Sequence, residues 1–476
     1  MNRPALAVGE EAAVHKTTLI VIVSLALVTF IGILSETALN IAYALLIDEL
    51  GVSAAVIQWL TTGYLLTLST LIPLSPLLVK KVRTKRLFQA AIFLFAFGTM
   101  LCGFATTFWL LLAGRIIQAV GTSISLPLLM NIILAQIPLS HRGRVMGLAG
   151  LVASFAPALG PTFGGVMIEW LNWHWIFFSV LPLLALSFLC GSRYIKDIRS
   201  EESISIDALS IFLSTLAFVG LVYGVSISAE LGWKDAAVLS CLVSGALSLA
   251  AFVVRQLRLD KPLIHVRVFS HAMFSIGAAI VMISMMTVLA AGFVLPLYVQ
   301  KALGFSSIAA ALVMLPGAMI NGIMSPFTGR FYDKHGARLL LLTGFFLLSL
   351  TLAVFSFTQA NLNETTVVYA LFMFGASMLL MPAQTNGLNQ LPPKYNADGV
   401  AIMATLQQVA GALGTALASS LLTMNSANFL TLYRDVTPAL QAQAIAFGTQ
   451  QNFRFFLLLG IVGFALSLWT RKKRTV

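Results

Sequence analysis

Fourteen apolar stretches, most of them about twenty residues long, divide this chain of 476 residues. A helix of about 20 residues crosses the ~30 Å hydrocarbon core of a bilayer. Hydrophobic residues make up 59% of the sequence and charged residues only 10%, whereas soluble domains carry about 25% charged residues. No segment alternates with period two, as the strands of a membrane β-barrel do. The sequence therefore predicts an all-α integral membrane protein and excludes an ordinary soluble enzyme.

The expected spans form three groups, with six in the first part of the chain, two in the middle and six at the end. The first is too long for one straight crossing, so we expect it to tilt or to end in an interfacial turn. The spans are 17–47, 54–78, 87–105, 107–134, 145–168, 174–193, 208–229, 235–256, 272–300, 306–328, 336–358, 365–390, 398–423 and 452–470.

Basic residues gather in the short segments between the expected spans. The chain carries 29 Lys and Arg against 17 Asp and Glu, a formal net charge of +12. An even number of spans places both termini on one side, and most Lys and Arg, including Lys80–Arg86 and Arg471–Arg474, then fall on that side. Cytoplasmic loops are enriched in Lys and Arg. We therefore expect a multi-pass protein of the cell membrane with both termini in the cytoplasm, and no nucleic-acid partner.

The chain also repeats itself at a constant offset of 254 residues. Pro157–Gly160 matches Gly411–Gly414, and Gly121 matches Gly375 at the same offset. Parallel repeats of membrane helices place a binding site at their interface. We expect an N-terminal six-helix bundle over residues 1–200, two inserted transmembrane helices with linkers over 201–262, and a C-terminal six-helix bundle over 263–476.

Glu36 is the one acidic residue that falls inside an expected span. A carboxylate in hydrocarbon is costly and is retained mostly for a function. Asn40 lies one turn later on the same helix face and is expected to hydrogen-bond it. We interpret Glu36 as a proton-binding site. The alternative is a structural acid paired with a neighbouring helix.

Arg115 is the one basic residue well inside an expected span. A buried guanidinium needs a carboxylate, a carbonyl or water as its partner. Gln118 shares its helix face. We predict that Arg115 responds to the protonation of Glu36, directly or through water. The alternative is an arginine near a helix end whose charged group reaches the membrane interface.

The fifth expected span is rich in glycine and proline. The spacing of Gly160 and Gly164 permits close helix approach, and Pro157 and Pro161 are expected to kink the helix. Together they predict a tightly packed, bent seam between helices. The residues of this motif are Gly150, Pro157, Gly160, Pro161, Gly164 and Gly165.

A short charged segment from Gly329 to Arg338 joins two spans on the expected cytoplasmic side. We expect Asp333 to cap the following helix or to pair with a nearby base. With Arg338 it suits a gating loop that clasps helix ends in one conformation. The alternative is an ordinary loop that sets the membrane topology.

Uncharged polar side chains recur in other spans and are candidates for a substrate cavity, where methionine and phenylalanine supply adaptable apolar surface. The three Cys and six His show no metal-ligand spacing, and no nucleotide-binding P-loop is present. We therefore expect no enzyme activity, metal or cofactor, and a proton gradient as the energy source. The substrate-binding candidates are Asn40, Gln58, Tyr64, Gln118, Asn321, Gln384 and Gln407.

These motifs resemble the major facilitator superfamily, and within it the fourteen-helix drug:proton antiporters of the lincomycin-resistance type. Ser35–Asn40 is similar to the family's first-helix motif, in which an acidic residue takes the proton. Gly114–Gly121 is similar to its fourth-helix motif, whose arginine takes part in proton coupling. Gly150–Gly165 resembles the fifth-helix motif of antiporters. The resemblance covers nearly the whole chain and implies a major facilitator fold of two six-helix halves plus two extra central helices.

One family motif, the loop after the second helix, is degenerate in the first half and intact in the second. The resemblance therefore implies a gating role only for Asp333 and Arg338. Where the family has Gly, Asp and Gly, the first half has Ser75, Val79 and Val82, and the second half has Gly329, Asp333 and Gly336.

The resemblance implies a monomeric, proton-coupled antiporter that exports hydrophobic or cationic drugs and other toxic small molecules by alternating access. Its partners are then small-molecule substrates, protons and the lipid bilayer. Two alternatives stay open, a proton symporter and an exporter of one specific metabolite or lipid. A receptor or a lipid-modifying enzyme is disfavoured by the internal repeat and the lack of catalytic groups.

Overall fold

A computed structural model describes residues 16–470 apart from 75–77, 79–80, 138–155, 158, 196, 198–206, 260–261, 359, 393–394, 434 and 436. Within these residues the chain forms helices and no strand. Thirteen of the described helices are long and apolar enough to cross a membrane. Half of the remaining expected span, 145–168, lies outside the described residues, and residues 156–157 and 159–170 are helical. The prediction of an all-α membrane protein is confirmed.

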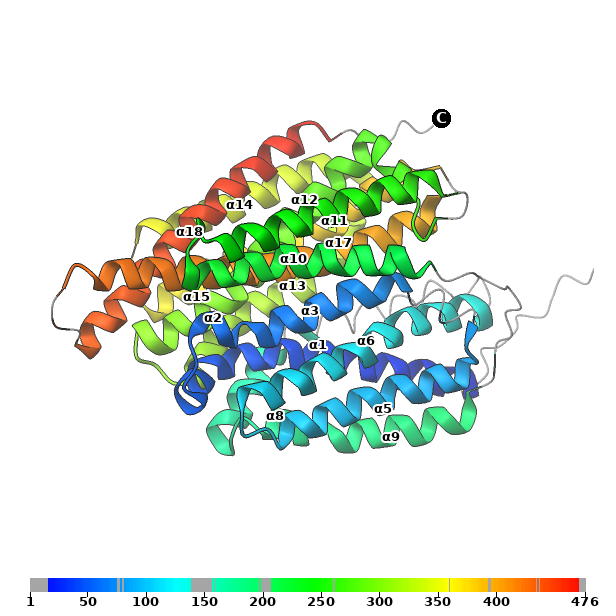
Figure 1. Ribbon diagram of the computed structural model, residues 1–476, viewed down its shortest axis with the longest axis horizontal. Coiled ribbons are helices and arrows are strands. Elements are labelled where there is room, and N and C mark those ends of the chain that lie inside the picture. The colour runs from blue at the N-terminus through cyan, green and yellow to red at the C-terminus, as the bar shows by residue number, and fades with distance from the viewer. Residues whose placement is uncertain are drawn as a thin grey trace, which may run out of the picture.

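Four of the expected spans contain more than one consecutive helix. Figure 1 shows the helices running side by side along the long axis of the molecule. In chain order they are α1 (Lys16–Leu50), α2 (Ala54–Ile57), α3 (Trp59–Leu71), η1 (Ile72–Leu74), α5 (Thr84–Gly103), α6 (Phe108–Gln136), α8 (Trp175–Phe178), α9 (Leu181–Tyr194), α10 (Ala208–Leu231), α11 (Ala236–Arg258), η2 (Val266–Ser270), α12 (Ala272–Leu297), η3 (Tyr298–Ala302), α13 (Ser307–His335), α14 (Ala337–Phe357), α15 (Leu362–Ser377), α16 (Leu380–Asn389), α17 (Asn396–Leu430) and α18 (Pro438–Leu468).

Several expected helix ends are wrong. α18 begins at Pro438, well before the expected residue 452. α13 continues to His335, so most of the expected loop 329–338 is helical. The turn into α14 is made by Gly336 alone, whose φ of 81° favours glycine. Hydropathy marks only the apolar middle of a membrane helix, while its polar ends extend beyond the hydrocarbon. α1 is a single helix of 35 residues that continues to Leu50, beyond the expected end at residue 47, and its tilt stays a prediction.

The two halves of the chain repeat one packing arrangement. A methyl group at Gly160 would lie 2.9 Å from the carbonyl oxygen of Leu34 in α1. A methyl group at Gly414, the repeat equivalent, would lie 2.4 Å from the carbonyl oxygen of Met286 in α12. The fifth helix thus packs closely on the first helix in each half, as the sequence repeat predicts. The division at residues 200 and 262 stays a prediction.

The inserted helices α10 and α11 lie along one seam between the halves (green in Figure 1). α10 contacts both α3 of the first half and α17 of the second, and α11 packs on α10. The Gln58 side-chain nitrogen donates to the Ser226 hydroxyl at 3.0 Å, and the hydroxyls of Ser228 and Ser420 lie 2.9 Å apart. α10 therefore makes polar contacts with both halves.

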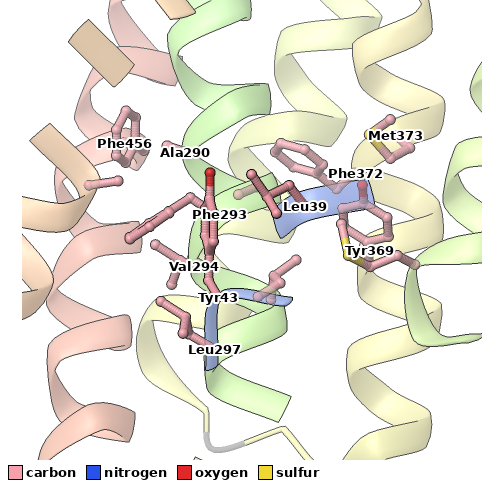
Figure 2. Close-up of a cluster of buried hydrophobic side chains, with 14 of the residues drawn as sticks. Leu39, Tyr43, Ala290, Phe293, Val294, Leu297, Tyr369, Phe372, Met373 and Phe456 are labelled. Carbon is pink, nitrogen blue, oxygen red and sulfur yellow. The ribbon is translucent and has the colours of Figure 1, made fainter. Parts of the chain in front are cut away.

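A second seam forms where α1 meets the second half. Figure 2 shows Leu39 and Tyr43 of α1 among apolar side chains of α12, α15 and α18, including Phe293, Phe372 and Phe456. The ring centroids of Tyr43 and Phe293 lie 5.8 Å apart. This buried cluster fixes α1 against the second half.

Polar contacts close the same seam at the end of α1 away from its N-terminus. The Gln300 side-chain nitrogen donates to the carbonyl oxygen of Ile41 at 3.1 Å. Lys301 forms an ion pair with Asp48. Both Gln300 and Lys301 lie in η3, a π-helical turn that extends α12. At this end of the bundle the two halves are therefore in contact.

Candidate functional site

Arg115 of α6 is fully buried and is held by three acceptors. Its Nε donates to the carbonyl oxygen of Leu60 at 3.4 Å. One terminal nitrogen, Nη1, donates to Gln118 Oε1 at 3.0 Å and to the Ser35 hydroxyl at 3.4 Å. The other, Nη2, is buried and has no hydrogen-bond partner among the described residues. The guanidinium is thus held in place with one donor nitrogen left over.

A second layer of contacts completes what we call the Arg115 cage, formed by Ser35, Leu60, Tyr64, Thr99 and Gln118. The Tyr64 ring lies under the guanidinium, with 4.3 Å from Cζ to the ring centroid. Gln118 Nε2 donates to the Thr99 hydroxyl at 2.8 Å. α1, α3, α5 and α6 all contribute to this cage, so its geometry depends on how four helices pack.

Glu36 lies on the same turn of α1 as Ser35 and interacts electrostatically with Arg115. Its side chain is only partly buried and makes no hydrogen bond or ion pair with the described residues. The expected bond from Asn40 is not present among the described residues, and Asn40 Oδ1 accepts from the Thr61 hydroxyl at 3.2 Å. A carboxyl group without a fixed partner is free to bind and release a proton.

The face of α1 that carries Glu36 points into the protein. Residues three, four and seven positions later share a face with Glu36, and these are Leu39, Asn40 and Tyr43. Leu39 and Tyr43 pack against the second half (Figure 2), and Asn40 bonds to α3 through Thr61. Glu36 therefore lies on the side of α1 that faces other helices, one turn from the contact between the halves.

The glycine face of the fifth helix packs directly on the turns of α1 that carry Glu36. A methyl group at Gly160 would lie 1.8 Å from the Thr37 hydroxyl, and one at Gly164 would lie 2.4 Å from the Ala38 carbonyl oxygen. Pro161, between them, is buried. The tight packing predicted for this seam is present.

The rest of the glycine and proline motif lies on either side of that contact. A methyl group at Gly165 would lie 2.7 Å from Ala311 Cβ in α13, so the fifth helix also touches the second half. Pro157 is partly buried. Gly150 lies outside the described part of the chain, and the kink expected at Pro157 and Pro161 stays a prediction.

The structure separates the predicted substrate-binding residues into different places. Tyr64 and Gln118 are fully buried members of the Arg115 cage. Gln58 is fully buried too, and bonds Ser226 of the inserted helix α10 rather than facing a cavity. Asn40 contacts Thr61. All four side chains make hydrogen bonds within the protein, and their substrate-binding role stays a prediction.

The remaining candidates lie in the second half. Gln407 of α17 donates to Gln384 of α16 at 3.3 Å, and both are partly buried. Asn321 of α13 is partly buried. These three amides stay predictions as substrate-binding residues.

The predicted gating loop differs from expectation. The N-cap residue of α14 is Gly336. Asp333 belongs to the last turn of α13, and its side chain lies outside the described residues. Arg338 is exposed on the first turn of α14. A gating role for this pair stays a prediction.

Three members of the cage, Ser35, Leu60 and Thr99, were not predicted as site residues. Ser35 directly precedes Glu36, so its position next to the proton-site candidate was a usable signal. Thr99 sits in an apolar helix with no charged neighbour, and no feature of the sequence distinguishes it.

Comparison with known proteins places the chain among transporters. A family model described as Major Facilitator Superfamily matches residues 25–415. Lincomycin resistance protein LmrB of Listeria monocytogenes is 43% identical over 456 residues, covering 95% of this chain and 97% of its own. The protein of the same name from Bacillus subtilis is 43% identical, covering 93% and 94%. The Multidrug resistance protein B homolog of Mycobacterium tuberculosis is 30% identical, covering 81% and 73%.

Solved structures show the same fold at low sequence identity. A bacterial homolog of the human lysosomal transporter Spinster, inward-facing and unoccupied, matches with a TM-score of 0.67 and 14% identity, covering 97% of this chain and 98% of its own. A POT family transporter in complex with a thioalcohol conjugated peptide matches with a TM-score of 0.68 and 13% identity, covering 94% of each chain.

Proposed function

This chain belongs to the major facilitator superfamily, and from that premise we propose that it exports hydrophobic or cationic drugs in exchange for protons by alternating access. It is a multi-pass membrane transporter and not an enzyme. Relatives named for lincomycin resistance and multidrug resistance support a drug exporter. We further propose that it works as a monomer in the cell membrane with both termini in the cytoplasm.

One observation carries the proposal of proton exchange, namely the state of Glu36. Its carboxyl group has no fixed partner among the described residues, lies on the face of α1 that points into the protein, and interacts with Arg115 in its cage. In the proposed cycle Glu36 takes a proton when the site opens outward. When the site opens inward, proton release and drug binding favour each other. The glycine contacts of the fifth helix then couple α1 to its neighbours during the change.

The available energy fits this exchange. A proton that enters down a potential of about 100 mV supplies about 2.3 kcal/mol. A gradient of one pH unit adds about 1.4 kcal/mol. One proton per uncharged drug therefore supports a concentration ratio of several hundredfold under these conditions. Exchange for a monovalent cationic drug moves no net charge, so the pH gradient alone then supports about tenfold.

Transport by purified protein in liposomes tests the proposal, with lincomycin as the probe. An imposed pH gradient is expected to drive lincomycin against the direction of proton flow in the parent protein and not in Glu36→Gln. Glu49→Gln is the matched control on the same helix, since Glu49 only accepts a bond from the Trp173 ring nitrogen at 2.9 Å, which glutamine can also accept. Proton-driven export by Glu36→Gln at the parent rate contradicts the proposal.

The alternative of a single metabolite also has support among the relatives. The riboflavin transporter RibZ of Clostridioides difficile is 26% identical, covering 84% of this chain and 87% of its own. A panel of drugs in an efflux-deficient host separates the two, because a drug exporter confers resistance to several unrelated compounds. Adding a protonophore is expected to raise the drug retained by the cells. A symporter that imports its substrate gives the opposite response.

A further inference from the structure

We propose that Thr99 of α5 is a positioning residue for proton coupling, because it fixes the Gln118 amide with its oxygen toward Arg115 and so holds the guanidinium in place for Glu36. This inference rests on the proposed exchange of protons. It assigns a role to a side chain that touches neither Arg115 nor Glu36.

The hydroxyl of Thr99 is available to Gln118 only as an acceptor. Thr99 is fully buried, and its one hydroxyl proton is donated to the carbonyl oxygen of Phe95 at 2.7 Å. A hydroxyl carries a single donor proton together with acceptor lone pairs. The 2.8 Å contact between Thr99 Oγ1 and the Gln118 amide therefore requires an N–H from Gln118. The amide nitrogen must face α5.

The neighbours on the other side of the amide require the same orientation. Arg115 has donors and no acceptor, and its Nη1 lies 3.0 Å from Gln118 Oε1. A reversed amide would place an NH₂ group against a guanidinium and an oxygen against the committed hydroxyl of Thr99. Only one of the two amide orientations satisfies both Thr99 and Arg115.

The helices that carry Thr99 and Gln118, α5 and α6, are in close contact. A methyl group at Gly98 would lie 2.6 Å from the backbone nitrogen of Gln118 and 2.6 Å from the Gly114 carbonyl oxygen. A methyl group at Gly114 would lie 2.6 Å from Cys102 Sγ. The backbones of α5 and α6 therefore lie in close contact beside Thr99, which brings its hydroxyl within hydrogen-bond distance of the Gln118 amide.

The consequence is a change in the charge that Glu36 experiences. The titratable groups that interact with Arg115 within the described residues are Glu36 and Tyr43 on α1, Tyr64 on α3 and Cys102 on α5. Glu36 is the only carboxyl among them. Without Thr99 the amide is free to reverse, and the guanidinium loses one of its acceptors and moves from its place. The carboxylate form of Glu36 then loses part of a stabilising charge.

The test compares Thr99→Val, which keeps the shape and removes the acceptor, with Thr99→Ser, which keeps the hydroxyl. Thr351→Val is the matched control, a buried threonine of α14 whose hydroxyl bonds only its own helix, at Leu347 and Leu348. The pH profile of lincomycin–proton exchange in liposomes is expected to shift to alkaline pH by about half a unit or more in Thr99→Val, since an opposite charge nearby shifts a carboxyl by 1–3 units. Thr99→Ser and Thr351→Val are expected to keep the parent profile.

A second measurement tests the role of Thr99 if Thr99→Val transports too slowly for a pH profile to be recorded. Infrared titration of the protonated Glu36 carboxyl band, assigned by its loss in Glu36→Gln, needs only folded protein and is expected to show the same shift. If the Thr99→Val protein does not purify as a single species, Thr99→Ala is used in its place, because it also lacks the acceptor. A parent-like midpoint in the acceptor-free variant, or an equal shift in Thr351→Val, overturns the inference. Absence of exchange by the parent protein at every pH instead contradicts the proposed function.

Discussion

At the scale of single residues, the planar fork of Arg115 satisfies groups on three helices at once. Nε reaches Leu60 on α3, while Nη1 reaches both Ser35 on α1 and Gln118 on α6. The ammonium group of a lysine is a point charge and does not reproduce such a fork. The shape of Arg115 matters as much as its charge.

Arg115→Lys is therefore expected to lower the rate of drug–proton exchange about tenfold or more. Losing one bond to a charged group costs about 1.5–3 kcal/mol, and about 1.4 kcal/mol corresponds to a factor of ten. Initial exchange rates in liposomes measure the effect. Arg454→Lys is the control, because Arg454 is exposed and, within the described part of the chain, its contacts are a hydrogen bond to Gln451 at 3.4 Å and the Phe357 ring. Equal rates for the parent and Arg115→Lys contradict a role for the fork.

Charge within an apolar stretch was enough to single out Glu36 and Arg115 from the sequence. Polarity alone did not show whether Gln58, Tyr64 and Gln118 face a cavity or other protein groups. Their partners lie on helices far away in the chain, so the answer depends on packing. Thr99 was missed because a threonine in an apolar helix commonly bonds its own backbone, and that local bond carries no information about function.

At the scale of helices, the contact between the fifth helix and α1 is the closest approach near the site. Gly164→Ala would place a methyl group 2.4 Å from the Ala38 carbonyl oxygen, so the two helices must separate. We expect a loss of about 1–3 kcal/mol of stability, as for other overpacked sites. Thermal unfolding in detergent measures it.

Gly292→Ala provides the matched control for this prediction. Gly292 lies in α12, and the nearest atom to an added methyl group is Asn40 Nδ2, at 3.8 Å. Alanine is favoured over glycine in a helix by about 1 kcal/mol. The control is therefore expected to match or exceed the parent in stability. Destabilisation of both variants by the same amount contradicts a specific role for the Gly164 contact.

The ion pair between Asp207 and Arg255 joins the beginning of α10 to the end of α11. Two hydrogen bonds of 2.8 and 3.0 Å from Arg255 hold the pKa of Asp207 at about 2, below its usual value of 3.8. The pair therefore stabilises the fold above pH 4, and this contribution is lost as the pH falls towards 2. Asp207→Asn is expected to lower the unfolding temperature at pH 7 but not near pH 2. A constant difference across that range contradicts this account.

Hydropathy was sufficient to predict the membrane helices but not where each one ends. The first turns of α18 and the last turns of α13 carry polar residues, so they were assigned to loops. The break between α15 and α16 within one expected span has no hydropathy signal, because both sides of it are apolar. Helix ends depend on hydrogen bonding and packing, which an average over twenty residues does not report.

At the scale of the whole molecule, the two halves meet at the end of α1 where Asp48 pairs with Lys301. Alternating access requires this contact to open once in each cycle. Joining Asp48→Cys to Lys301→Cys with a short, reducible thiol cross-linker is therefore expected to stop exchange, and reduction is expected to restore it. The two single variants, treated in the same way, are the controls. Full exchange by the cross-linked protein contradicts opening at this end.

The internal repeat predicted how each half packs but not where the inserted helices lie. Gly160 and Gly414 show the repeated contact directly. The inserted pair has no counterpart in the repeat, so the sequence offers no template for its position. Its place along the α3–α17 seam rests on long-range bonds such as those of Ser226 and Ser228.

Proton release upon drug binding tests the central claim most directly. The measurement is made in lightly buffered detergent solution. Below the pH at which Glu36 is half-protonated, lincomycin is expected to release close to one proton per parent protein molecule. Above that pH little release is expected. Glu36→Gln is expected to bind lincomycin and to release none. Release by Glu36→Gln equal to that of the parent would show that another group carries the proton.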